Sequence, residues 1–110
     1  MDSMSTGSRT NLEHLIDNTD LQLVDGSILD QNALEPLVAE ADQIYHMAAA
    51  VGVKLIMEHL VATLENNVQG TENVIRLAHG LGNKKVILAS SSEVYGKSPA
   101  LPWTEDDDIL

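Results

Sequence analysis

Short apolar segments alternate with amphipathic helical patterns along this chain, and this alternation restricts the possible fold more than any other feature. Residues 21–24, 43–47 and 85–89 are predicted strands, each short, apolar and bounded by polar residues or glycine. A helical pattern over residues 30–41 separates the first two strands, and a longer one over 61–81 separates the last two. Strands that alternate with helices form parallel βαβ units. The sequence therefore predicts an α/β fold with a doubly wound parallel sheet.

The predicted helices carry their own start and packing signals. Asp30 or Asn32 can cap the helix that separates the first two strands, and a short helix is expected over residues 10–16. In the long helix, Gly70 costs about 1 kcal/mol relative to alanine, so we expect it to permit close packing. The apolar residues of the long helix recur at intervals of three, four and seven and are expected to share one face: Val61, Leu64, Val68, Ile75 and Ala78.

The chain is strongly acidic, with 17 Asp and Glu residues against 6 Lys and Arg and a net charge of -11. Such a charge disfavours binding to nucleic acid or to an anionic membrane surface. Cysteine is absent and the four histidines show no ligand-like spacing, so we expect neither disulfides nor a metal site. The longest apolar run is far too short to span a bilayer, and no signal-peptide pattern is found, so we expect a cytoplasmic protein.

Four short motifs occur in a fixed order along the chain: MDSMSTGSR, YHMAAAVGV, NNVQGTENV and ASSSEVYG. Together they resemble the extended short-chain dehydrogenase/reductase superfamily and, within it, the NAD-dependent nucleotide-sugar epimerases, dehydratases and decarboxylases. The resemblance implies that residues 1–110 are a partial NAD(P)-binding Rossmann domain. The domain would run from the end of strand 2 through strand 5 and the following loop, with three main parallel strands.

The resemblance also implies that NAD is the cofactor. Asp2 stands where the family places an acidic residue that accepts hydrogen bonds from the adenosine ribose, which favours NAD over NADP. Arg9 is the competing candidate, because a cation there could receive a 2′-phosphate. Ser27 stands where the family usually has an acid at the adenine, and Ile28 could cover the adenine ring or simply pack in the core. The implied cofactor-binding residues are Asp2, Ser3, Ser5, Thr6, Gly7, Ser27, Ile28, Met47, Ala48, Ala49, Asn67 and Ala89.

The remaining motif residues have supporting roles in the resembling enzymes. Ala48 and Ala49 are small enough to let the backbone approach the dinucleotide, although small residues also suit a crowded strand–helix turn. Asn67 would hold backbone and water near the active site. Asp25 or Asp30 could compensate for the acid that Ser27 replaces.

The last motif carries the residues that the resemblance assigns to catalysis. Ser91 is placed where a hydroxyl bonds the sugar 4-hydroxyl, and Ser92 and Glu93 occupy the next two positions, where dehydratases have an Asp–Glu pair. Ser-Glu before Val-Tyr-Gly resembles UDP-glucuronate decarboxylases, and a 4-epimerase-like enzyme is the other option. A surface carboxylate is the competing interpretation of Glu93. We expect Ser90 to cap the backbone and Tyr95 to be structural.

Two family motifs do not occur in the sequence: the Gly-x-x-Gly-x-x-Gly turn and the Tyr-x-x-x-Lys motif. We therefore expect an internal segment of a nucleotide-sugar enzyme that binds NAD weakly and is inactive by itself. The alternative is a non-catalytic α/β module that binds a nucleotide or a partner chain. We expect residues 21–24 to pair directly with residues 43–47 in a three-stranded sheet, with a homodimer through open strand edges as the second option.

Overall fold

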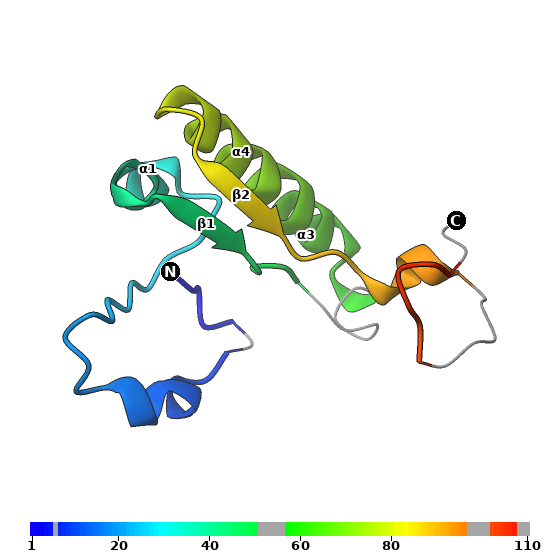
Figure 1. Ribbon diagram of the computed structural model, residues 1–110, viewed down its shortest axis with the longest axis horizontal. Coiled ribbons are helices and arrows are strands. Elements are labelled where there is room, and N and C mark those ends of the chain that lie inside the picture. The colour runs from blue at the N-terminus through cyan, green and yellow to red at the C-terminus, as the bar shows by residue number, and fades with distance from the viewer. Residues whose placement is uncertain (6, 51–56, 97–101, 108–110) are drawn as a thin grey trace.

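The computed structural model describes residues 1–5, 7–50, 57–96 and 102–107, and its regular elements lie mostly in the middle of the chain (Figure 1). A 3₁₀ helix, Arg9–Leu15, lies near the N-terminus, and a second one, Ser92–Tyr95, follows the last strand. The remaining elements are α1 (Gln31–Glu40), β1 (Gln43–His46), α3 (Leu60–Leu64), a π-helical turn (Glu65–Gln69), α4 (Gly70–Gly80) and β2 (Lys85–Leu88).

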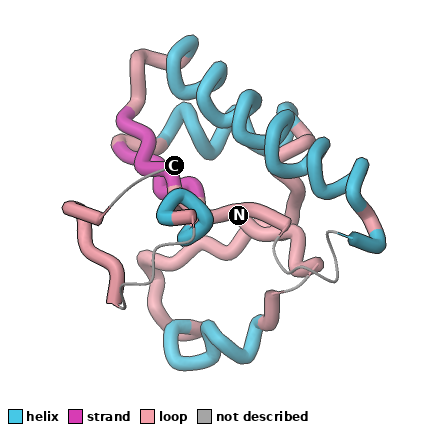
Figure 2. The backbone as a smooth tube through the Cα atoms, turned by 90° about the vertical axis from the view of Figure 1, so that its right-hand side faces the viewer, coloured by secondary structure: helices cyan, strands magenta, loops and turns pink. Residues whose placement is uncertain are grey.

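Strands β1 and β2 form a parallel pair in which Ile44 is opposite Val86 and His46 is opposite Leu88. Ile44 and Val86 pack against the helices, whereas Tyr45 points to the other face and is 64 % exposed. Figure 2 shows α1 and α4 together in one layer over this short sheet. The expected βαβ arrangement is therefore present, with helices on one face of the sheet in the described part of the chain.

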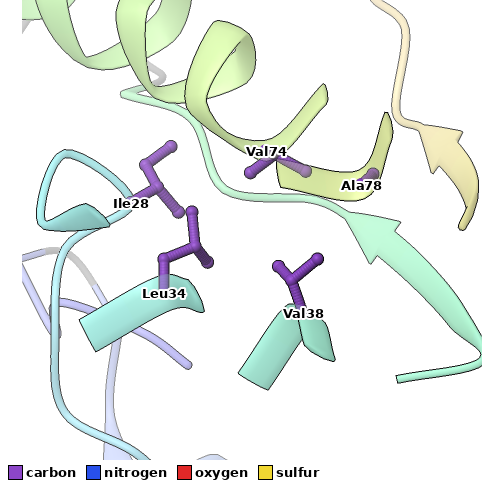
Figure 3. Packing of buried hydrophobic residues seen from close by; sticks show 5 residues of the cluster. All are labelled: Ile28, Leu34, Val38, Val74 and Ala78. Atoms are coloured by element: carbon purple, nitrogen blue, oxygen red, sulfur yellow. The ribbon is translucent and has the colours of Figure 1, made fainter. Parts of the chain in front are cut away.

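The core is small and lies between α1 and α4, with one further residue from the turn that precedes α1 (Figure 3). Asp30 begins α1 by accepting hydrogen bonds from the backbone N–H groups of Asn32 and Ala33, as the capping signal predicts. This start directs one face of α1 toward α4. The buried apolar residues are Ile28 from the turn, Leu34 and Val38 from α1, and Val74 and Ala78 from α4.

The expected pairing of residues 21–24 with residues 43–47 is wrong. The N–H of Asp2 donates to the carbonyl of Val24 at 3.0 Å, and the N–H of Gly26 donates to the carbonyl of Asp2 at 3.0 Å. These two bonds form a parallel bridge between Asp2 and Asp25. Residues 21–24 make no ladder with β1, so the sheet has two strands among the described residues instead of three.

The long helix also differs from its expected form. The π-helical turn divides it into α3 and α4, and Val61, Leu64, Val68 and Ile75 are each more than half exposed. The face that is buried carries smaller or polar residues instead, among them Gly70 and Asn73. Ala78 is the one residue of the expected face that is buried, so the apolar spacing identified the helix correctly and the packed face only at its C-terminal end.

The molecule is less compact than its length suggests. Its radius of gyration is 16.2 Å, whereas a compact domain of this length has about 13 Å. Among the described residues, no helix combines the length and apolar character needed to cross a membrane. The same residues contain no cluster of three acidic, histidine or cysteine side chains that could hold a metal ion.

Candidate functional site

A cavity of about 280 Å³ lies beyond the carboxyl end of β1, between that end and the N-terminal segment. We call it the groove. Its lining comes from three parts of the chain and from Asn66. The three parts are the turn at residues 26–28, residues 47–50 after β1, and the N-terminal residues Met1, Asp2, Ser3, Ser5 and Gly7. Ligands of open α/β sheets bind outside the carboxyl ends of the strands, so the groove is in the position where a ligand is expected.

Most residues that the resemblance assigns to the cofactor gather in the groove. Thr6 lies outside the described residues. Asn67 and Ala89 line an adjoining cavity of about 220 Å³, which also contains Met47, Ala48 and Ala49. The groove itself is lined by Asp2, Ser3, Ser5, Gly7, Ser27, Ile28, Met47, Ala48 and Ala49. The assignment of these residues to a cofactor remains a prediction, but their placement around one cavity is a structural fact.

Asp2, which the resemblance assigns to the ribose, is held by its own backbone contacts. Its main chain makes both bonds of the bridge, and one carboxylate oxygen, Oδ1, accepts the N–H of Met4 at 2.7 Å. This local bond turns the chain sharply, and Met4 adopts a positive φ of 55°. The turn keeps the Asp2 carboxylate beside Gly7, where an added Cβ would lie 3.4 Å from Asp2 Oδ1.

The charged residues considered for the cofactor site already make contacts with other parts of the chain. The Arg9 guanidinium forms an ion pair with the Asp25 carboxylate, and Asp30 caps α1. Ser27 Oγ accepts the N–H of Leu29 at 3.2 Å. Asp25 and Asp30 were the two candidates to replace the acid at position 27, and each already makes another contact.

Ile28 is fixed from two sides by α4. Its side chain packs so closely on Gly70 that an added Cβ would lie 2.3 Å from Ile28 Cδ1. Its carbonyl accepts the amide of Asn73 at 3.0 Å, and Asn73 Oδ1 in turn accepts from Gln31 at 2.9 Å and from Arg76 at 3.0 Å. Both interpretations of Ile28 are compatible with this position, because the residue is in the core and also lines the groove.

Sequence reasoning missed Asn73, which lies behind the groove and holds Ile28. It also missed four residues of the lining: Met1, Gly26, Ala50 and Asn66. Asn73 is 0 % exposed and satisfies its amide in both directions. An asparagine within a helical pattern normally indicates a solvent-facing position. The available signal was its place in the NNVQGTENV motif.

A second network joins the end of β1 to the π-helical turn. Thr71 Oγ1 donates to the Asn67 carbonyl at 2.6 Å and therefore accepts from Nε2 of His46 at 2.9 Å. The Asn67 amide bonds the backbone of Ala50 twice, at 2.7 Å and 3.1 Å. Burial lowers the pKa of His46 below its ordinary value of 6.5, so the imidazole is held in its neutral form.

The residues assigned to catalysis lie in an exposed turn just beyond β2. Ser91 caps the 3₁₀ helix by accepting the N–H of Glu93 at 3.3 Å, which leaves its own O–H available as a donor. Ser90 was expected to make the cap, so the capping role falls one residue later than predicted. Ala89 lines the cavity that adjoins the groove. Among the described residues, Ser91, Ser92 and Glu93 line neither the groove nor its neighbouring cavities.

Tyr95 closes this turn by stacking on Trp103, with ring centroids 5.3 Å apart and an interplanar angle of 16°. Aromatic pairs in this arrangement contribute packing energy beyond simple burial. The stack supports the structural role expected for Tyr95.

The family to which this chain belongs follows from its match to a known family. The sequence profile of the family described as GDP-mannose 4,6 dehydratase matches residues 1–109. The chain belongs to this family. The resemblance to the NAD-dependent epimerases and dehydratases of the extended short-chain dehydrogenase/reductase superfamily is thereby confirmed.

Two decarboxylases are among the proteins similar to this chain. A UDP-N-acetyl-alpha-D-glucosaminuronate decarboxylase of Bacillus cytotoxicus is 42 % identical over 110 residues, which cover 100 % of this chain and 33 % of the relative. UDP-glucuronic acid decarboxylase 1 of Danio rerio is 37 % identical over 106 residues, which cover 96 % of this chain and 24 % of the relative. The chain therefore spans between a quarter and a third of the length of these relatives.

Among solved structures, a DesIV double mutant (dTDP-glucose 4,6-dehydratase) from Streptomyces venezuelae with NAD and DAU bound is similar to this chain. The TM-score is 0.81 at 31 % identity, over 94 % of this chain and 32 % of the dehydratase. The expected partial Rossmann-like α/β fold is confirmed at this level, without the third strand.

Proposed function

We propose that the full-length protein carrying this chain is an NAD-dependent nucleotide-sugar enzyme whose groove holds the adenosine half of NAD. The observation that carries this proposal is the gathering of nine residues assigned to the cofactor, from three separate segments, around one cavity. The groove offers a carboxylate for ribose hydroxyls, an aliphatic side chain for an aromatic ring, and small residues where a backbone must come close. These groups fit a dinucleotide.

The sugar would lie at the Ser91–Glu93 turn, which follows Ala89 at the border of the adjoining cavity. NAD bound in the groove would supply the hydride acceptor for oxidation of the sugar at C4. Ser91 would bond the sugar 4-hydroxyl, and its cap bond is compatible with this role, because its oxygen accepts the N–H of Glu93 and its proton is available to donate. Ser92 stands in the place of the dehydratase acid, which argues against a dehydratase.

Decarboxylation of a UDP-hexuronate is the reaction favoured, because two similar proteins are named as decarboxylases of such sugars. Oxidation at C4 places a ketone β to the C6 carboxylate, and a β-keto acid loses carbon dioxide readily. Glu93 is the residue available for proton transfer at this stage. A 4-epimerase-like reaction is the second candidate, since Ser91 would serve the same C4 oxidation. A homodimer remains a prediction, tested by the solution mass of the full-length protein.

The experiment measures two activities of the full-length protein. Calorimetry with NAD tests binding, and carbon dioxide release from UDP-glucuronate tests decarboxylation, with UDP-glucose epimerisation measured in parallel. Glu93→Gln is expected to reduce carbon dioxide release at least tenfold while preserving C4 oxidation, with Glu105→Gln as a matched control for lost charge. Nucleotide binding without turnover of any sugar would favour the non-catalytic module instead.

A further inference from the structure

We propose that Asp25 helps to set the cofactor preference by holding Arg9 in an ion pair, so that no free cation meets a 2′-phosphate at the ribose end of the groove. This inference rests on the proposed function, because it concerns which dinucleotide the groove accepts. It assigns a specificity-determining role to Asp25, which lies outside the groove lining itself.

The bridge between Asp2 and Asp25 gives the geometric reason. Residues that pair in register across parallel strands direct their side chains to the same face, so the two carboxylates are neighbours. Asp2 faces the groove, and Asp25 beside it pairs with Arg9. Arg9 is only two residues beyond Gly7, which also lines the groove.

The charges that line the groove therefore disfavour the binding of NADP. None of the described residues that line the groove is a lysine or arginine, so a 2′-phosphate would meet the Asp2 carboxylate first. Arg9 is the cation placed to offset that repulsion, and Asp25 engages it. Removing the Asp25 carboxylate would release Arg9 toward the phosphate and would also remove one negative charge.

The size of the effect follows from the exposure of the pair. The Arg9 and Asp25 side chains are 66 % and 57 % exposed, so solvent and salt screen their attraction. An exposed ion pair of this kind contributes little to stability, so its loss is not expected to unfold the protein. The expected change in the ratio of NADP to NAD affinity is about fivefold.

The test uses the full-length protein and measures dissociation constants for NAD and NADP by calorimetry. Asp25→Asn is expected to raise the NADP:NAD affinity ratio about fivefold, and Asp25→Ser repeats the test with a side chain that cannot mimic the carboxylate. Both variants retain the backbone bonds of Val24 and Gly26 that make the bridge. Asp17→Asn, an exposed residue away from the groove lining, removes the same charge and is expected to leave the ratio unchanged.

The decisive variant is the double substitution Asp25→Asn with Arg9→Gln, which is expected to return the ratio to the wild-type value. If the double variant keeps the gain, charge alone explains it and the role of the pair is overturned. An unchanged ratio in both Asp25 variants, with normal NAD binding by the wild type, overturns this inference and leaves the proposed function standing. If the wild type binds neither dinucleotide, both proposals fail.

Discussion

The two parts of the candidate site are held in place in different ways. The turn that carries Ile28 is fixed by buried contacts to a helix more than 40 residues away in sequence, through Gly70 and Asn73. The Ser91–Tyr95 turn depends on a cap within two residues and on one aromatic stack with Trp103. The first part is thus built into the core, and the second is a local structure on the surface.

Substitutions in the two parts are therefore expected to act on different properties. A change in the buried part alters the free energy of unfolding and, through it, the shape of the groove. A change in the exposed turn alters chemistry with little effect on the fold, because surface substitutions usually change stability by less than about 0.5 kcal/mol.

Ser91→Ala in the full-length protein is expected to lower kcat about a hundredfold, as loss of a group in a proton-transfer network does. Stability is expected to fall by about 1 kcal/mol at most, because Ser91 is exposed but its Oγ caps the 3₁₀ helix. Steady-state kinetics together with a urea unfolding curve measure both quantities. Ser90→Ala is the matched control and is expected to keep wild-type kcat. A large loss of stability in Ser91→Ala would contradict the expected difference between the two parts.

Asn73→Ala is expected to destabilise the protein by about 2 kcal/mol, because it leaves the buried Ile28 carbonyl without its donor. Urea denaturation measures the change. Asn32→Ala, at an exposed position on α1, serves as the control and is expected to stay near the wild-type value. Equal effects of the two substitutions would show that burial of Asn73 does not stabilise the turn.

Gly70→Ala and Gly80→Ala form a matched pair within α4. The added methyl group at position 70 meets the buried Ile28 side chain, and such overpacking costs about 1–2 kcal/mol. The same group at position 80 has nothing within 4 Å, so the gain in helix propensity is expected to stabilise the protein slightly. Thermal melts of the two variants should therefore shift in opposite directions. Shifts of the same sign would argue against close packing at Gly70.

His46 gives the smallest expected effect, a pH dependence of stability. Burial lowers its pKa in the folded state, so the unfolded state binds more protons once the pH falls toward the ordinary value of 6.5. Stability is therefore complete above that value and decreases as the pH falls through it toward the lowered folded pKa. The pH profile of the unfolding free energy should be flatter in His46→Gln. Identical profiles would exclude His46 as a contributor.

The sequence predicted local features well and long-range ones less well. Asp30 capped α1 as expected, and Gly70 permitted a close approach, because both depend on neighbouring residues or on one contact. The pairing of residues 21–24 was predicted wrongly, since local pattern cannot show that Asp2 competes for Val24 and Gly26. For the site, the motifs identified the lining of the groove, whereas the role of Asn73 depends on a partner 45 residues away.

The bridge between Asp2 and Asp25 has a consequence for how such a protein can evolve. It brings the two ends of residues 3–24 together, so this segment is a closed loop whose exposed middle, including Asn18 and Thr19, contributes nothing to the core. Lengthening a loop with fixed ends costs little, about 0.6 kcal/mol for each doubling. Insertions and deletions there can accumulate while the rest of the fold is conserved. The segment that borders the groove can therefore change in length without affecting the Ser91–Tyr95 turn.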